Sequence, residues 1–386
     1  MKFFIDFATG SLNKYGEELC GDRVEFYNDK GKFVAVLSDG LGSGVKANIL
    51  ATLTAKIALT MLKEGIDIEE VVDTIINTLP ICAVRKVAYS TFTMVSVDKD
   101  GMVYIAEFDN PSIFFLRNGD TRPINWNEKF INGRKIREAS FKLRQNDILV
   151  LVSDGVVYAG VGQVLNLGWQ WKDIANHLRR FTNISMSAKK ITNNLLGACN
   201  QLYMERPGDD TTVATIRVTQ PNKAVIFTGP PIDKNKDKEV VEEIMRTSGK
   251  RIICGGTAGN IVARELGEEL RSSFKIIDKE IPPIGYINKI DLVTEGVLTL
   301  RKAIDKLHNI KSSHDLKFIY EEDGASLLAR MLYEDCTHIK MIIGRAINPA
   351  HQNPDFPNEL SIKLYLVNEL KDVLIELGKI VEVEYC

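Results

Sequence analysis

The chain has 386 residues and a net charge of −2 at pH 7, which argues against a global basic surface for nucleic acid or for an anionic membrane. Hydrophobic residues make up 45% of the sequence and charged residues 26%, typical values for a globular protein of two or three domains. The six cysteines are scattered, so neither a zinc site nor a disulfide framework is expected. We find no signal-peptide pattern and no run of about 18 apolar residues, and therefore expect a cytoplasmic protein without a membrane segment.

The first half of the chain alternates apolar and polar residues in short runs, as half-buried antiparallel strands do. Between these runs, two segments carry apolar residues at three- and four-residue spacing and predict amphipathic helices over 45–64 and 67–79. The turn at Lys99-Asp100-Gly101 predicts a hairpin. Strands, inserted helices and strands again indicate an α+β fold built as an antiparallel β-sandwich. The expected strands are 24–28, 32–39, two or more within 90–120, 147–155 and 211–219.

The pattern changes after residue 220, where Pro221-Asn222 reads as a linker. Beyond it the chain predicts strand, helix, strand and helix in alternation, which is the signature of a parallel α/β unit. We therefore expect one domain over residues 1–220 and a second, smaller α/β domain over 221–386.

Four aspartates of the first half share one context, because each stands at a strand end or in the adjoining loop. Carboxylates that converge from several strand ends make an oxygen-rich site suited to Mg²⁺ or Mn²⁺. No cluster of basic residues accompanies them, and buried carboxylates without counterions are costly. A divalent ion, or a pair of them, would resolve that cost. The four residues are Asp22, Asp39, Asp154 and Asp209.

A simpler interpretation is open for each Asp-Gly pair alone, since Asp-Gly is a common turn dipeptide. Asp100-Gly101 and Asp323-Gly324 have the same dipeptide, and no chemistry is assigned to them. A metal site is favoured by the four phrases taken together and by their order along the chain, which is GD, SDGLGSG, SDG and GDDTT.

That order resembles the metal-dependent protein phosphatase family, the protein phosphatase 2C superfamily, in its bacterial SpoIIE-type branch, over about residues 5–219. "SDGLGSGVKA" is similar to the DGMGxGxxA signature of the branch, "LVSDGV" to its third motif and "GDDTTVATIRV" to its closing DDMTVVVVRV. "FDNPSIFFLRNGD" resembles the GxxPxxLxRxG pattern of the central hairpin. The resemblance implies a sandwich flanked by helices on both outer faces.

By this resemblance, Asp39 would bridge two divalent cations, Mn²⁺ or Mg²⁺, and the carbonyl of Gly40 would reach one of them. Asp22 would complete that second site, while Asp154 and Asp209 would bind the first ion together with Asp39. Metal-activated water would then attack phosphorus in line, with no covalent enzyme intermediate.

Three further features follow from the resemblance. Asp210 would stand beside the ligands without binding an ion. Leu41 occupies the position where eukaryotic members carry a histidine proposed as general acid, which the bacterial branch also lacks. The helices over 45–64 and 67–79 would be a regulatory element whose position completes the metal site.

In the second domain, "RIICGGTAGNIVARELG" runs from a strand through glycines into a helix. Backbone N–H groups at such a helix N-terminus form a ready anion site, here over Gly255, Gly256, Thr257 and Gly259. The alternative is a tight turn capped by Thr257, because no complete nucleotide motif follows. Asp291 and Glu295 could face a crevice at this helix N-terminus, or they could face the solvent.

The leading hypothesis is a metal-dependent phosphoserine/phosphothreonine protein phosphatase whose second domain senses a small anionic ligand or a partner. By resemblance, its substrate would be a phosphorylated signalling protein such as an anti-sigma-factor antagonist. Two alternatives are a non-catalytic phosphatase-like scaffold and a phosphatase of small metabolites. The four aspartates argue against the scaffold; the sequence does not separate the two enzymes.

Overall fold

The structure is a computed structural model that describes residues 4–29, 31–78, 90–183, 186–273, 281–312, 317–346 and 362–386. The chain divides into two compact units, Met1–Gln220 and Pro221–Cys386.

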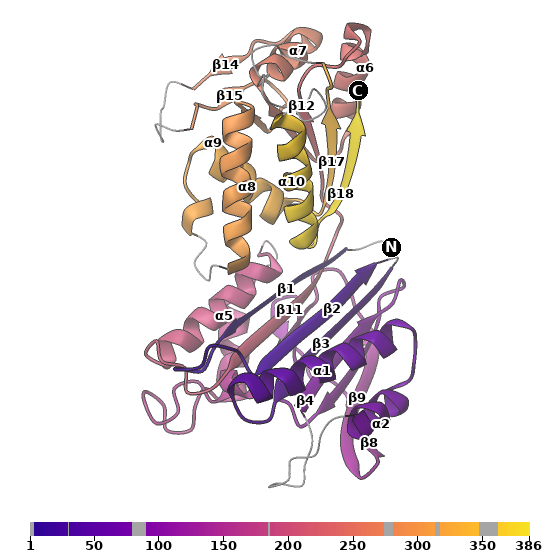
Figure 1. Cartoon of the computed structure of the whole chain (residues 1–386), viewed down its shortest axis with the longest axis vertical. Helices are drawn as coiled ribbons and strands as arrows, with labels where there is room; N and C mark the ends of the chain where they lie inside the picture. The colour runs from indigo at the N-terminus through magenta and orange to yellow at the C-terminus, as the bar shows by residue number, and fades with distance from the viewer. Residues whose placement is uncertain are drawn as a thin grey trace. The chain divides into compact units, whose positions relative to one another are not determined.

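Two antiparallel sheets build the first unit (Figure 1). The first sheet has the strand order β1 (Phe4–Leu12), β11 (Thr211–Thr219), β10 (Ile148–Val152), β6 (Phe114–Arg117) and β7 (Asp120–Thr121). The second sheet has the order β2 (Asp22–Asp29), β3 (Lys32–Gly40), β4 (Ser90–Val97), β5 (Met102–Phe108), β9 (Arg134–Lys142) and β8 (Asn127–Ile131).

Strand β3 shows why the sheets stack. Its side chains alternate between the two faces, and Phe33, Ala35 and Leu37 pack against apolar residues of β10 and β11 in the other sheet. The intervening Val34 and Val36 pack instead against helices on the outer face. These helices are α1 (Gly44–Lys63) and α2 (Ile68–Thr78).

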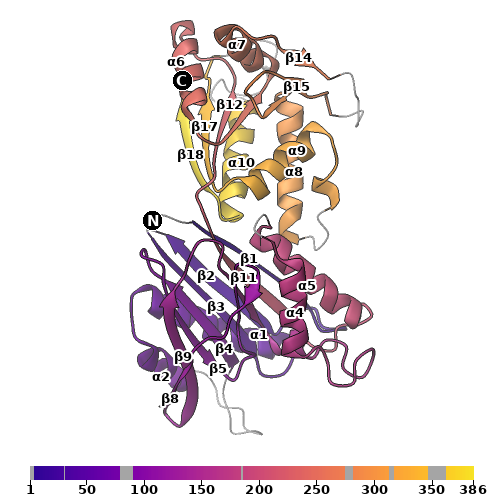
Figure 2. The same cartoon turned by 180° about the vertical axis from the view of Figure 1, so that it is seen from behind.

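The outer face of the first sheet is covered in the same way (Figure 2). Val150 and Val152 of β10 pack against α4 (Trp171–Phe181) and α5 (Ala188–Leu202). The predicted antiparallel sandwich flanked by helices is therefore confirmed.

Strands β1, β8 and β9 are absent from the sequence prediction. Strand β1 pairs with β11 along its whole length. Strands β8 and β9 form a hairpin around Asn132 and Gly133, which both have positive φ. Asn-Gly between two polar-apolar runs is the strongest short hairpin signal in a sequence, so this pair could have been predicted.

Helix α1 bears on the expectation that the chain has no membrane segment. Among the described residues, it is a helix long and apolar enough to span a membrane by length and composition, although only 33% of its most apolar window is buried. Small buried residues such as Ala51, Ala55 and Ala58 let it pack closely on the second sheet, and in Figure 1 it lies across that sheet. This packing is that of a helix within a folded domain.

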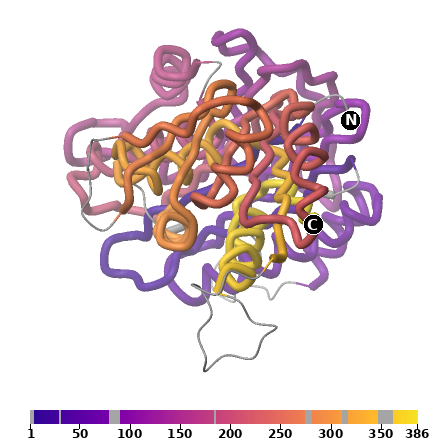
Figure 3. The backbone as a smooth tube through the Cα atoms, turned by 90° about the horizontal axis from the view of Figure 1, so that it is seen from above, coloured from indigo at the N-terminus to yellow at the C-terminus, as the bar shows by residue number. Residues whose placement is uncertain are grey.

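The second unit has a mostly parallel sheet, as predicted. Figure 3 traces the backbone of this unit in colours from red through orange to yellow. The strand order is β14 (Arg271–Ser272), β15 (Gly285–Tyr286), β16 (Leu292–Thr294), β13 (Lys250–Cys254), β12 (Lys223–Thr228), β17 (His338–Ile343) and β18 (Ile380–Tyr385). The short strands β14 and β15 pair antiparallel at one edge.

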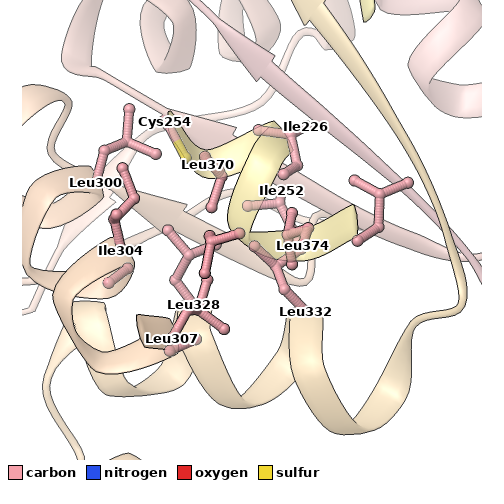
Figure 4. Packing of buried hydrophobic residues seen from close by; sticks show 14 of the residues in the cluster. Ile226, Ile252, Cys254, Leu300, Ile304, Leu307, Leu328, Leu332, Leu370 and Leu374 are labelled. Atoms are coloured by element: carbon pink, nitrogen blue, oxygen red, sulfur yellow. The ribbon is translucent and has the colours of Figure 1, made fainter. Parts of the chain in front are cut away.

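Helices cover both faces of this sheet. On one face, Ile226 and Ile252 pack against leucines of three helices, as Figure 4 shows. These helices are α8 (Val297–Ser312), α9 (Gly324–Arg330) and α10 (Ile362–Glu376). On the other face, Val225 and Phe227 pack against α6 (Asp237–Arg246) and α7 (Gly256–Leu266). Each face has its own apolar core, so the unit is a doubly wound α/β domain.

A buried ion pair holds the turn before β10. Asp147 is only 1% exposed and accepts hydrogen bonds from Nε and Nη2 of Arg117 (2.9 and 2.6 Å) and from the backbone N–H of Arg144 (2.7 Å). Because removing one partner of a buried pair leaves the other charge uncompensated, Asp147→Ala is expected to lower the free energy of unfolding by about 3 kcal/mol. Urea denaturation measures this change. Asp147→Asn, which keeps an acceptor, should cost clearly less; equal costs would contradict the role of the acceptor.

Candidate metal centre

Asp22 and Asp39 face each other directly across the β2–β3 ladder. Asp39 continues the β3 positions that face the sandwich interior, and Asp22 is 5% exposed. Like charges directly opposite in an antiparallel pair repel each other. This pair of strands therefore places two carboxylates where they need a shared proton or a shared cation.

The other two predicted ligands come from the first sheet. Asp154 follows the end of β10 and opens the short helix α3 (Asp154–Val157), and Asp209 lies just before β11. Because β10 and β11 are antiparallel neighbours, the end of one lies beside the start of the other. Asp154 lies within hydrogen-bonding reach of Asp39 and helps to raise the pKa of that carboxyl group. The structure thus brings the four predicted aspartates together at one end of the sandwich.

The glycines after these aspartates serve close packing. A Cβ on Gly40 would lie 2.1 Å from the carbonyl oxygen of Ala47 in α1, and a Cβ on Gly155 would lie 2.1 Å from the carbonyl oxygen of Asp210. Neither glycine is among the described residues with positive φ. Gly40 is the last residue of β3 and Gly155 lies within α3, so both Asp-Gly pairs are sites of close backbone approach within regular elements.

Burial dominates the electrostatics of the cluster. It raises the pKa of Asp39 to about 9, with further increases from Asp22, Asp154 and Asp209. Burial also raises the pKa of Asp22 to about 7, although the nearby hydroxyls of Ser153 and Thr212 lower this pKa. The pKa values of Asp154 and Asp209 are raised by burial as well.

Asp210 is more deeply buried than the ligand predicted next to it. Its side chain is 4% exposed, and Oδ1 accepts the backbone N–H of Lys14 at 3.0 Å. The side chain of Asp209 is 42% exposed, with Oδ1 3.9 Å from Nζ of Lys14. That Asp210 binds no ion itself stays a prediction. Its burial shows that it is part of the cluster.

Sequence reasoning missed several polar neighbours of the cluster. The backbone N–H of Thr212 donates to Oγ of Ser153 at 2.8 Å, which ties the end of β10 to the start of β11. The hydroxyl of Tyr203 donates to the carbonyl oxygen of Gly155 at 2.7 Å. Ser153 could have been noted from the shared SDG phrase; Tyr203 and Lys14 become visible only through the tertiary structure.

The residues present fit divalent cations. Among the described residues, Oδ2 of Asp22 and Oδ2 of Asp210 are buried side-chain oxygens without a hydrogen-bond partner. All the donors are oxygen atoms, which suits hard ions such as Mg²⁺ and Mn²⁺. In the part of the chain that the structure describes, no three histidine, cysteine or acidic side chains are already arranged to hold a metal ion. The fit therefore rests on the buried oxygens and their mutual repulsion.

The raised pKa values give a pH dependence for the metal-free chain. A carboxyl group with a raised pKa keeps its proton in the folded state after the unfolded state has lost it, so its contribution to stability is full below about pH 4 and falls as pH rises. With pKa values of about 7 for Asp22 and about 9 for Asp39, the free energy of unfolding should fall between pH 5 and 9. Urea denaturation in EDTA measures this fall. It should be smaller in Asp39→Asn, and an equal fall in both proteins would contradict the prediction.

In the second unit, the glycine-rich turn takes the predicted place between β13 and α7. Gly255 is the N-cap residue with φ 115°, and no described side chain caps the helix. The alternative of a turn capped by Thr257 is therefore wrong, while anion binding at Gly255, Gly256, Thr257 and Gly259 stays a prediction.

Asp291 and Glu295 do not share a crevice, because they flank opposite ends of β16. Oδ2 of Asp291 accepts the backbone N–H of Arg251, and Oδ1 lies 3.1 Å from Nζ of Lys250. Asp291 therefore belongs to the end of the sheet where the parallel strands begin, away from the glycine-rich turn.

Comparison with known proteins agrees with the geometry of the first unit. Residues 29–219 match the family model described as Stage II sporulation protein E (SpoIIE). The chain is 26% identical over 193 residues to Stage II sporulation protein E of Bacillus subtilis (strain 168), a match that covers 48% of this chain and 22% of that protein. The chain thus spans about a fifth of the length of this curated relative.

Solved structures show similar domains. The phosphatase domain of SpoIIE from Bacillus subtilis, with a fragment of its regulatory domain, is 21% identical, with a TM-score of 0.48 and coverage of 56% of this chain and 63% of that one. The RsbU and RsbW domains of Rv1364c from Mycobacterium tuberculosis are 14% identical, with a TM-score of 0.48 and coverage of 62% and 68%. The family match and the four motifs together identify residues 29–219 as a SpoIIE-type domain of the protein phosphatase 2C superfamily.

Proposed function

We propose that the first unit is a metal-dependent serine/threonine protein phosphatase and that the second unit regulates it. The observation that carries the proposal is the convergence of Asp22, Asp39, Asp154 and Asp209 from two sheets at one end of the sandwich. A cluster this acidic has little reason to exist in a scaffold that binds no cation, because its members destabilise one another.

Asp22, Asp39, Asp154, Asp209 and the carbonyl of Gly40 would hold two divalent cations, Mn²⁺ or Mg²⁺. When bound, such ions supply a water molecule of lowered pKa and neutralise the charge on the phosphoryl oxygens. The protein's own part is to hold its carboxylates in place. The hydroxyls of Ser153 and Thr212 favour the ionised form of Asp22, while the backbone N–H of Lys14 fixes one oxygen of Asp210.

Lys14 gives the rim of the cluster a cation. Its side chain is 38% exposed, and its ammonium group lies 3.9 Å from Asp209. The loop that carries it is held by the bond from the Tyr15 N–H to the Pro207 carbonyl oxygen at 2.8 Å. An exposed lysine in this place would meet the phosphate of a phosphorylated side chain as it approaches.

The substrate is proposed from the resemblance to be a phosphoserine or phosphothreonine on a signalling protein, for instance an anti-sigma-factor antagonist. The second unit would bind a small anionic ligand, with the backbone N–H groups around Gly255 and Gly256 as its contact. Its action on the first unit would pass through the helices α1 and α2; the first turn of α1 packs against Gly40.

The test is hydrolysis of p-nitrophenyl phosphate and of a phosphothreonine peptide by the full chain, with Mn²⁺, with Mg²⁺ and with EDTA. Turnover of both substrates that EDTA abolishes is the expected result. Turnover of p-nitrophenyl phosphate and small metabolites without turnover of any phosphopeptide would point to a metabolite phosphatase. Failure to bind Mn²⁺ in calorimetry, together with no turnover, would overturn the proposal in favour of a binding scaffold.

A further inference from the structure

A groove opens on the first unit between the edges of the two sheets. It has a volume of about 570 Å³, within the range of pockets that hold a ligand or a large side chain. Its lining includes Arg144, in the turn that precedes β10, whereas Asp154 follows the other end of that strand. Five strand residues at about 3.3 Å each place the groove roughly 17 Å from the metal centre. Its lining residues are Phe115, Arg117, Pro123, Ile124, Asn125, Ser140, Phe141, Lys142, Leu143 and Arg144.

The floor of the groove is apolar and well ordered by packing. The rings of Phe115 and Phe141 lie with centroids 4.8 Å apart, and Leu143 is 3% exposed. These side chains belong to the core between the sheets. Apolar surface that is reached from solvent through such a groove can bury a large apolar side chain of another molecule.

One wall of the groove is formed by Arg117, whose guanidinium group is held in place by its neighbours. The guanidinium group of Arg117 lies 5.0 Å above the ring of Phe115 and donates to both oxygens of Asp147 and to the carbonyl oxygen of Lys142. A side chain held by so many contacts loses little further freedom when a partner binds, which favours affinity.

The rim carries two more cations, Lys142 and Arg144. Both are exposed, and neither forms an ion pair within the described residues. The lining includes three basic residues and no acidic one; Asp147 offsets Arg117, so two positive charges remain. This local charge opposes the net charge of −2 of the whole chain.

From this arrangement we propose that the groove is a docking site for an acidic segment of a partner protein, anchored by one aromatic or large aliphatic side chain. The apolar floor takes the anchor, and Lys142 and Arg144 pair with carboxylates on either side of it. Charge complementarity of this kind speeds association and selects partners. The site is separate from the metal centre and does not depend on its activity.

The experiment begins with a displayed library of random 12-residue peptides, selected on the full chain. Selected peptides should be enriched in Asp and Glu around one Phe, Tyr, Trp or Leu. Fluorescence polarisation then measures the Kd of a labelled selected peptide for the full chain, for the Lys142→Glu/Arg144→Glu variant and for a matched control, Lys172→Glu/Arg180→Glu. The control changes two exposed basic residues on α4, outside the groove.

The groove variant is expected to raise the Kd at least ten-fold, while the control leaves it within two-fold. Replacing the peptide's aromatic residue by Ala should also weaken binding, and so should raising NaCl from about 50 to about 500 mM, because salt screens exposed charges. Circular dichroism confirms that both variants fold. Selected peptides without acidic enrichment, or equal Kd values for the parent chain and the groove variant, would overturn the proposal.

Discussion

Asp39→Asn is expected to reduce Mn²⁺-dependent turnover of p-nitrophenyl phosphate by about 10³-fold or more. Asp39 faces Asp22 across the ladder and lies within hydrogen-bonding reach of Asp154, so in the proposed centre it is the carboxylate shared by both ions. Losing a metal ion costs several kcal/mol of charge stabilisation in the transition state, and each 1.36 kcal/mol is a tenfold change in rate.

The same substitution should stabilise the metal-free protein. An asparagine side chain is neutral without taking up a proton, so the cost of keeping Asp39 protonated at pH 8, in a buried place beside Asp22, Asp154 and Asp209, would disappear. In EDTA at pH 8 the melting temperature should therefore rise, while the stabilisation that Mn²⁺ gives the parent chain should largely vanish. If Asp39 had only a structural role, the melting temperature in EDTA would fall in Asp39→Asn.

Asp100→Asn is the matched control. It changes another Asp-Gly pair, which lies in the exposed turn between β4 and β5. Asp39 lies beside the opposite end of β4. Turnover and melting temperature should both stay close to those of the parent chain. Retained turnover in Asp39→Asn, with the control also active, would contradict the assignment of the bridging ligand.

The cluster could be predicted because its members sit at strand ends, where chain order and strand pairing determine position. Asp22 and Asp39 lie on consecutive strands, and Asp154 and Asp209 lie next to strands that pair. The depth of Asp210 could not be predicted, because it depends on the chain around Gly21, whose Cβ position would lie 2.9 Å from Oδ2 of Asp210.

The groove is a second example of what sequence patterns miss. Phe115 and Phe141 belong to strands of different sheets, and no spacing along the chain relates them. Arg117, Lys142 and Arg144 likewise read as ordinary surface charges in the sequence. Only the packing of the two sheets makes them one site. The order and periodicity of the elements were enough to predict the sandwich and the parallel unit, although not every strand in them.

Gly40→Ala is the second substitution for which a large effect is expected. The added methyl group would lie 2.1 Å from the carbonyl oxygen and 2.8 Å from the Cα atom of Ala47. Both are backbone atoms of α1, which cannot rotate away as a side chain can. Helix α1 must therefore move off the β3 end that carries Asp39, and overpacking of this kind costs about 1–3 kcal/mol of stability.

The displacement should cost more in activity than in stability. A misplacement of about 1 Å in a catalytic arrangement lowers rates by about 10²-fold, so turnover with Mn²⁺ should fall by that order while the chain stays folded. Gly197→Ala is the matched control, because the residue lies inside α5 and, apart from the adjoining residues and backbone of that helix, no atom lies within 4 Å of its Cβ position. There the change should raise stability by about 0.5–1 kcal/mol and leave turnover unchanged. If Gly40→Ala keeps full turnover, then the contact between α1 and the Asp39 strand end does not set the geometry of the centre, and α1 is not the element through which the second unit could regulate it.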